Sequence, residues 1–197
     1  MRLQPKNVAC EEIQDVKSMV TERIKDWHAA NRKMPTHVLY YRDGVSDSVW
    51  DISSTTREYT DKFQQYAQVK DKELPQIRAA FEAYAKSLRT DTRFKLTAVV
   101  VAKRHNVKML PDSDDPNYAK QNNGKEKNGN CRPGTLVDTV VTSAYYSDFY
   151  LQSHDGIKGT AKSAHYFMLV NEMNFRDTDL QEFVSSVDFP VLRRYTS

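Results

Sequence analysis

The sequence predicts an α/β fold in which helices flank a mixed sheet. Three successive segments carry this prediction. Residues 37–42 form a mostly apolar run, residues 74–88 repeat apolar side chains at spacings of three and four, and residues 94–102 are rich in β-branched side chains. These patterns indicate a strand, a helix and a second strand. Because such a unit connects by a right-handed crossover, we expect its two strands to be parallel.

The rest of the chain adds elements on both sides of this unit. Apolar residues recur at spacings of three and four over residues 12–32, which predicts an amphipathic helix that ends before Pro35. Three further strands and one short helix are predicted over residues 135–141, 148–152, 164–170 and 178–184.

Two polar segments interrupt these elements. Residues 47–62 show neither a helical nor a strand period, and we interpret residues 47–64 as an insertion. Residues 111–134 are rich in Asp, Asn, Gly, Lys and Pro, which predicts a long exposed excursion.

Composition limits the class of protein. A chain of 197 residues with 39% hydrophobic residues suits one domain or a large fragment of one. Its net charge of +3 permits a nucleic-acid partner without requiring one. Cys10 and Cys131 fit neither a disulfide framework nor a zinc site, which favours a reduced intracellular setting. The start lacks the apolar core of a signal peptide, and the longest apolar run is too short for a bilayer, so we expect no membrane insertion.

The strongest candidate for chemistry is Asp43. The apolar run from His37 meets Arg42, Asp43 and Gly44, which predicts a buried central strand that ends in a carboxylate. Ligands of open α/β sheets usually bind at such strand ends. The alternative is that Asp43 serves a turn, because Asp-Gly is a common turn dipeptide.

Several short motifs follow one another along the chain. In chain order they are Tyr41-Arg42-Asp43-Gly44-Val45-Ser46, Lys103-Arg104-His105, Pro133-Gly134-Thr135, Val137-Asp138, Asp148-Phe149-Tyr150-Leu151, Ser153-His154, Gly156-Ile157, Gly159-Thr160 and His165-Tyr166. This ordered set resembles the PIWI domain of eukaryotic Argonaute proteins. The resemblance covers about residues 11–183, so the prediction is a partial PIWI domain over residues 1–197 with a divergent tail at 184–197.

The resemblance implies an RNase H-like fold that holds a small guide RNA and, in active members, cuts the paired target RNA with two divalent ions, Mg²⁺ or Mn²⁺. Asp43 matches a metal-binding catalytic aspartate of the family. Glu11 matches the catalytic glutamate, which would hold a hydrated ion. For Glu11 the alternative is a helix-start residue favoured by the helix dipole, and Glu12 competes for the same role.

Two of the four site residues expected from the family have no match in this sequence. An aspartate should precede Glu11, yet residues 1–10 contain none, and the resemblance fades before the expected terminal histidine or aspartate. These departures suggest a truncated paralogue, a fragment, or a gene prediction that reads through introns. We therefore expect little or no cleavage, since losing metal ligands removes orders of magnitude in rate.

The resemblance also implies contacts to the guide backbone. The positions that match are Lys103, Arg104, His105, His154, Lys158 and Lys162. The alternative for the basic tripeptide is a solvated strand end, and His165 is expected to be a core histidine. Recognition would be of phosphate and sugar, hence independent of base sequence and weakened by salt.

Three functions remain open at this point. The first is a guide-RNA-binding protein of the RNA-silencing type, cytoplasmic or nuclear, with a remnant of an endoribonuclease site and with silencing-complex proteins as partners. The second is a non-catalytic interaction module or decoy that binds Argonaute partners without RNA. The third is an unstable product without function.

Overall fold

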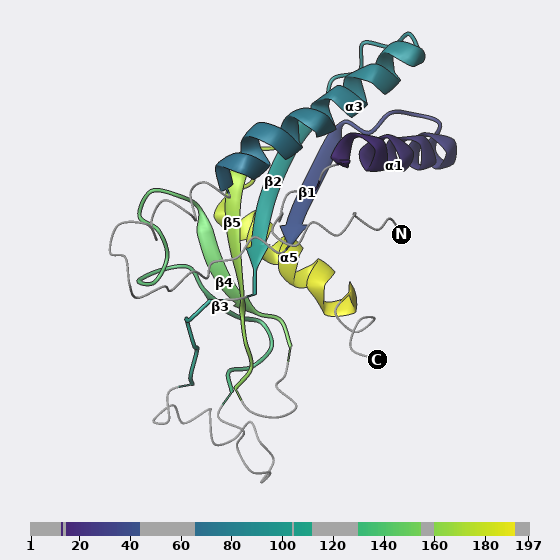
Figure 1. Ribbon diagram of the computed structural model, residues 1–197. Helices are drawn as coiled ribbons and strands as arrows, with labels where there is room; N and C mark the ends of the chain where they lie inside the picture. Colours follow the sequence, from purple (N-terminus) through teal and green to yellow (C-terminus); the bar gives the residue numbers. More distant parts are fainter. Residues whose placement is uncertain are drawn as a thin grey trace. The chain divides into compact units, whose positions relative to one another are not determined.

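The computed structural model describes residue 13 and residues 15–43, 66–103, 105–111, 130–154 and 160–191, with side chains described up to residue 184 (Figure 1). Five strands form one sheet in the order β1-β2-β5-β4-β3. The elements, in chain order, are α1 (Val16–Asn31), β1 (His37–Asp43), the π-helical turn η1 (Val69–Glu73), α3 (Leu74–Ser87), β2 (Lys95–Ala102), β3 (Thr135–Val137), β4 (Asp148–Gln152), β5 (Ala164–Asn171) and α5 (Asp177–Val191).

The predicted mixed α/β sheet is confirmed. The amide of Lys95 donates to the carbonyl of Thr36 at 2.9 Å, so β1 and β2 begin side by side and run in parallel after the α3 crossover. The amide of Glu172 donates to the carbonyl of Leu96 at 3.1 Å, which sets the end of β5 beside the start of β2 and makes that pair antiparallel. β4 pairs antiparallel with both β5 and β3.

The chain divides into two compact units. Unit 1 comprises Met1–Val100 and Leu169–Met173, and unit 2 comprises Val101–Met168 and Asn174–Ser197. In unit 1, α1 packs against α3 through the apolar stripe that the sequence predicts (Figure 1). The buried centre of this contact is formed by Ile24, Met34, Phe81 and Ala85, with partly buried neighbours that include Val38 of β1.

The prediction that β1 is a buried central strand is wrong. Among the described strands β1 lies at one end of the order, beside β2, and Arg42 is its only buried residue. The strand with the buried run is β2, in which every residue after Lys95 is buried. An apolar run reports partial burial of side chains but not the number of neighbouring strands, which the chain topology sets.

The limits of several elements differ from those predicted. β3 ends at Val137 because the backbone leaves the sheet, and Val140 adopts a positive φ of 68° that a strand excludes. The last helix, α5, is longer than predicted and spans Asp177–Val191. Its buried residues Leu180 and Val184 lie one turn apart and fix its inner face.

Three predictions fall outside the described residues. The insertion at 47–64 lies wholly outside them, as do most of the polar excursion, at 112–129, and the end of the tail, at 192–197. Within the described ranges, no helix has the length and apolar character needed to cross a membrane.

Candidate nucleic-acid interface and carboxylate site

Asp43 lies at the carboxyl end of β1, where the sequence predicts it. Successive strand residues point to opposite faces, so the buried Arg42 and the exposed Asp43 face in opposite directions. The guanidinium of Arg42 also donates to the backbone carbonyl of Asp43. The buried arginine therefore helps to fix the backbone conformation at Asp43, the residue that carries the candidate carboxylate.

Glu73 holds Arg42 in place. Its carboxylate accepts two hydrogen bonds from Arg42 Nε, at 2.9 and 3.1 Å, and one from the Tyr40 hydroxyl at 2.8 Å. Both charged side chains are buried, at 7% exposure for Arg42 and 1% for Glu73. Burial and the neighbouring Glu73 carboxylate raise the pKa of Tyr40 well above its usual range, so its hydroxyl remains a donor.

Glu11 lies outside the described residues, and its predicted role stays a prediction. Two positions further along the chain, the amide of Ile13 donates to Glu73 Oε1 at 3.2 Å. Glu73 therefore binds both the segment that follows Glu11 and the arginine that precedes Asp43.

The described residues do not provide a two-ion centre. Within the described ranges, no three His, Cys, Asp or Glu side chains are grouped closely enough to hold a metal ion. Glu73 is committed to Arg42 and Tyr40. A pair of Mg²⁺ or Mn²⁺ ions needs several oxygen ligands. The described residues do not place enough carboxylates around Asp43 to supply them.

The basic residues predicted to contact RNA lie in unit 2 and at its border. Lys103 follows β2 and is exposed, and His105 is partly buried. His105 Nε2 lies 2.8 Å from the carbonyl oxygen of Ser163 and donates to it. This bond ties the segment after β2 to the residue that follows Lys162, whose side chain is exposed.

His154 comes close to the same segments through the β4–β5 pair. Leu151 pairs with Ala164, so the chain leaving β4 runs beside the chain that enters β5. The buried side chain of Gln152 donates from Nε2 to the carbonyl of His154 at 2.7 Å, while the His154 side chain is exposed. Lys103, His154 and Lys162 thus come from three segments anchored to one another.

His165 is a core histidine, as predicted. It is 3% exposed, and its Nε2 lies 2.7 Å from Asp148 Oδ2. Its ring stacks on Tyr150, with centroids 4.3 Å apart and planes at 10°. His105 meets the edge of the same tyrosine at 5.1 Å. This buried group supports the segments that carry the basic side chains.

Sequence reasoning missed the residues that orient the site. Glu73 ends the charged run that begins at Lys70, a pattern that predicts a solvated side chain. Asp148 stands at a strand start, and its spacing gives no sign of its histidine partner. Two polar atoms beside the His105–Ser163 bond, His105 Nδ1 and Ser163 Oγ, are buried and have no hydrogen-bond partner among the described residues. Each can therefore still form a hydrogen bond.

Two predicted contacts, Arg104 and Lys158, lie outside the described residues. Lys103, His154 and Lys162 are exposed as a phosphate contact requires. His105 differs, because one ring nitrogen bonds Ser163 and the other is buried. Its geometry is that of a positioning residue, and its direct contact to RNA stays a prediction.

The class of this chain is an α/β domain with a mixed sheet. It combines a parallel crossover between β1 and β2, antiparallel strands that complete the sheet, and a carboxylate at the end of β1. The Piwi domain family matches residues 2–189. The chain therefore belongs to the Piwi domain family, and the predicted resemblance and RNase H-like mixed sheet are confirmed.

The relatives are Argonaute proteins. The chain is 33% identical over 193 residues to Protein argonaute 2 of Oryza sativa subsp. japonica, covering 98% of this chain and 16% of the relative. It is 32% identical over 181 residues to Protein argonaute 7 of Arabidopsis thaliana, covering 92% and 15%. The chain thus spans about a sixth of the length of these relatives.

Solved Argonaute structures share the fold. Kluyveromyces polysporus Argonaute with a guide RNA matches with a TM-score of 0.74 and 29% identity, over 92% of this chain and 20% of that one. The C-terminal lobe of a budding yeast Argonaute matches with a TM-score of 0.69 and 29% identity, over 88% and 32%.

Proposed function

We propose that this chain binds a small guide RNA through its phosphate backbone and does not cut the paired target. The bond between His105 and Ser163 carries the proposal, because it joins the segments of Lys103 and Lys162. The likeness to an Argonaute solved with a guide RNA supports the same ligand class. Target RNA, silencing-complex proteins and a cytoplasmic or nuclear location are predictions of this proposal.

The chemistry is that of a phosphate binder. Lysine ammonium groups neutralise phosphates as point charges and release counterions. The segments that present Lys103 and Lys162 are held by the His105 bond, so little ordering is required on binding. Such contacts read no base edges, and binding is therefore expected to be independent of sequence.

The double substitution Lys103→Ala with Lys162→Ala is expected to weaken RNA binding about tenfold at low salt. Removing two phosphate contacts also lowers the slope of log K against log salt by about 1.4 for single-stranded RNA. Fluorescence anisotropy with a 5′-labelled short RNA across a salt series measures both quantities.

A matched control removes two exposed lysines of unit 1, Lys25→Ala with Lys86→Ala. Net charge changes equally in both double variants, so the control is expected to bind RNA nearly as the parent does. If the two variants lose affinity equally, binding is diffuse and the proposed interface is wrong. Undiminished binding in both would also show that the proposed interface is wrong. A parent chain that binds no RNA would favour the alternative function, a protein-interaction module without RNA.

The second expectation concerns cleavage. Asp43 and Glu11 match two of the four family site residues, and the described donor set does not match a two-ion centre. We expect no cut of a guide-paired target in Mg²⁺ or Mn²⁺, as resolved on a sequencing gel. A metal-dependent cut that disappears in Asp43→Asn would overturn this expectation. A cut that persists in Asp43→Asn would indicate a contaminating nuclease.

A further inference from the structure

An exposed apolar segment lies between β3 and β4 in unit 2. Val140 is 99% exposed and Tyr145 is 92% exposed, and Val141 and Tyr146 are about half exposed, at 48% and 49%. Their concentration in one short segment is unusual, because exposed apolar side chains on a soluble protein are normally scattered. This segment, residues 138–147, is not part of the proposed RNA interface.

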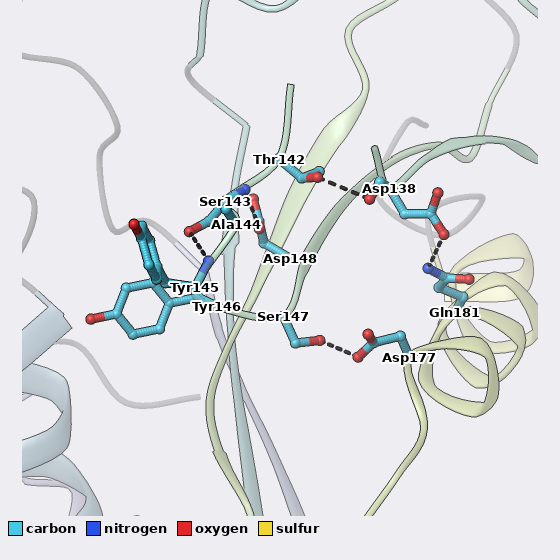
Figure 2. Close-up of a pocket in the computed structure, with 10 residues that line it drawn as sticks. All are labelled: Asp138, Thr142, Ser143, Ala144, Tyr145, Tyr146, Ser147, Asp148, Asp177 and Gln181. Atoms are coloured by element: carbon cyan, nitrogen blue, oxygen red, sulfur yellow. Dashed lines mark hydrogen bonds between the residues drawn. The ribbon is translucent and has the colours of Figure 1, made fainter. Parts of the chain in front are cut away.

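The segment borders a pocket of about 360 Å³. Figure 2 shows the two tyrosine rings on one side of the pocket and Asp177 and Gln181 of α5 on the other. This volume lies at the small end of ligand-binding pockets, so it suits one long side chain better than a large cofactor.

Hydrogen bonds hold the walls of the pocket. Gln181 Nε2 donates to Asp138 Oδ2 at 3.1 Å, and the Ser147 hydroxyl donates to Asp177 (Figure 2). The amide of Ser143 donates to Asp148 Oδ1 at 2.8 Å. The segment is therefore tied to α5 at two points and to β4 at a third, which reduces the ordering cost of binding.

The pocket carries negative charge. One of its three carboxylates, Asp148, contacts His165, whose Nε2 lies 2.7 Å from Asp148 Oδ2. Asp138 accepts a hydrogen bond from the side-chain amide of Gln181, and Asp177 accepts one from the hydroxyl of Ser147. Neither donor brings a compensating charge. None of the described lining residues is Lys, Arg or His. An ionised carboxylate offers about four acceptor positions, so both aspartates retain capacity for a cationic donor.

We propose that this pocket binds an arginine side chain from an extended segment of a partner protein. A guanidinium presents a planar fork of N–H donors to a carboxylate and stacks on an aromatic face. Asp138 and Asp177 supply the carboxylates, and the exposed ring of Tyr145, on the other side of the pocket, offers a surface to residues that flank the arginine (Figure 2). Charge complementarity favours this occupant over RNA, because the aspartates repel phosphate. The inference is independent of the RNA-binding proposal.

A fluorescein-labelled peptide, Gly-Ser-Leu-Arg-Leu-Ser-Gly, tests the proposal against the same peptide with citrulline in place of arginine. Citrulline keeps the planar shape and loses the charge. We expect the arginine peptide to bind the full chain at least tenfold more tightly, as measured by anisotropy. Asp177→Asn combined with Tyr145→Ala is expected to abolish that preference, since the asparagine can still accept the bond from Ser147.

The matched control is Asp26→Asn with Trp27→Ala on α1, which also removes one exposed carboxylate and one exposed ring. Circular dichroism checks that both variants fold. Equal binding of the two peptides to the parent chain would overturn the proposal, as would an equal loss in the control. If the pocket variant loses affinity for RNA and keeps the peptide preference, the surface is a base-stacking site and the proposal is wrong.

Discussion

Glu73→Ala is expected to lower the free energy of unfolding of unit 1 by about 3–5 kcal/mol. Removing one partner of a buried ion pair leaves the other charge without compensation, and this is the cost typical of such a change. Here Arg42, at 7% exposure, would lose its carboxylate, and Tyr40 would lose its acceptor. Urea unfolding followed by tryptophan fluorescence measures the effect, because Trp27 of α1 lies in unit 1.

Two further variants test the reason for this effect. Glu82→Ala removes an exposed carboxylate from α3, the helix that follows Glu73, and is expected to change stability by less than about 0.5 kcal/mol. Arg42→Met combined with Glu73→Leu removes both buried charges and is expected to recover most of the loss. A double variant no more stable than Glu73→Ala would show that packing, and not the unpaired charge, sets the cost.

Asp148→Ala is expected to destabilise unit 2 by about 3 kcal/mol or more. The substitution leaves two donors without an acceptor, the amide of the partly buried Ser143 and Nε2 of the buried His165. Each hydrogen bond to a charged group contributes about 1.5–3 kcal/mol. Hydrogen exchange followed by mass spectrometry of peptides from β4 and β5 measures the loss in this unit directly.

Asp179→Ala is the control for Asp148. Asp179 also forms an ion pair, with Arg176 at 2.7 Å, but that pair lies at the surface. Solvent screens exposed pairs, so exchange in β4 and β5 is expected to stay unchanged. Equal exchange in the Asp148→Ala variant and the parent would show that the buried pair contributes little to unit 2.

These two buried groups link the fold to the proposed function. Glu73 sets the orientation of Arg42 and hence of the strand end that carries Asp43. Asp148 and His165 support Tyr150, which in turn contacts His105. Loss of either group is therefore expected to disturb its site through packing, without removing a ligand contact.

Much of the fold could be predicted because the type of each helix and strand follows from residues within that segment. The helical spacing over residues 74–88 and the β-branched run over 94–102 report the burial of single segments, and both elements form where predicted. The parallel crossover follows from their order alone. The position of β1 at the end of the described strand order could not be predicted, since strand neighbours depend on contacts between distant segments.

The sequence by itself determined the order and type of the elements, the place of Asp43 at a strand end and the family resemblance. Only the tertiary structure decided which side chains meet. Arg42 and Glu73 are 31 positions apart, and His105 and Ser163 are 58 apart. The spacing of apolar residues along one segment shows which face of that segment is buried. It does not show which distant polar group will lie opposite, because that pairing forms only when the folded core removes both groups from water.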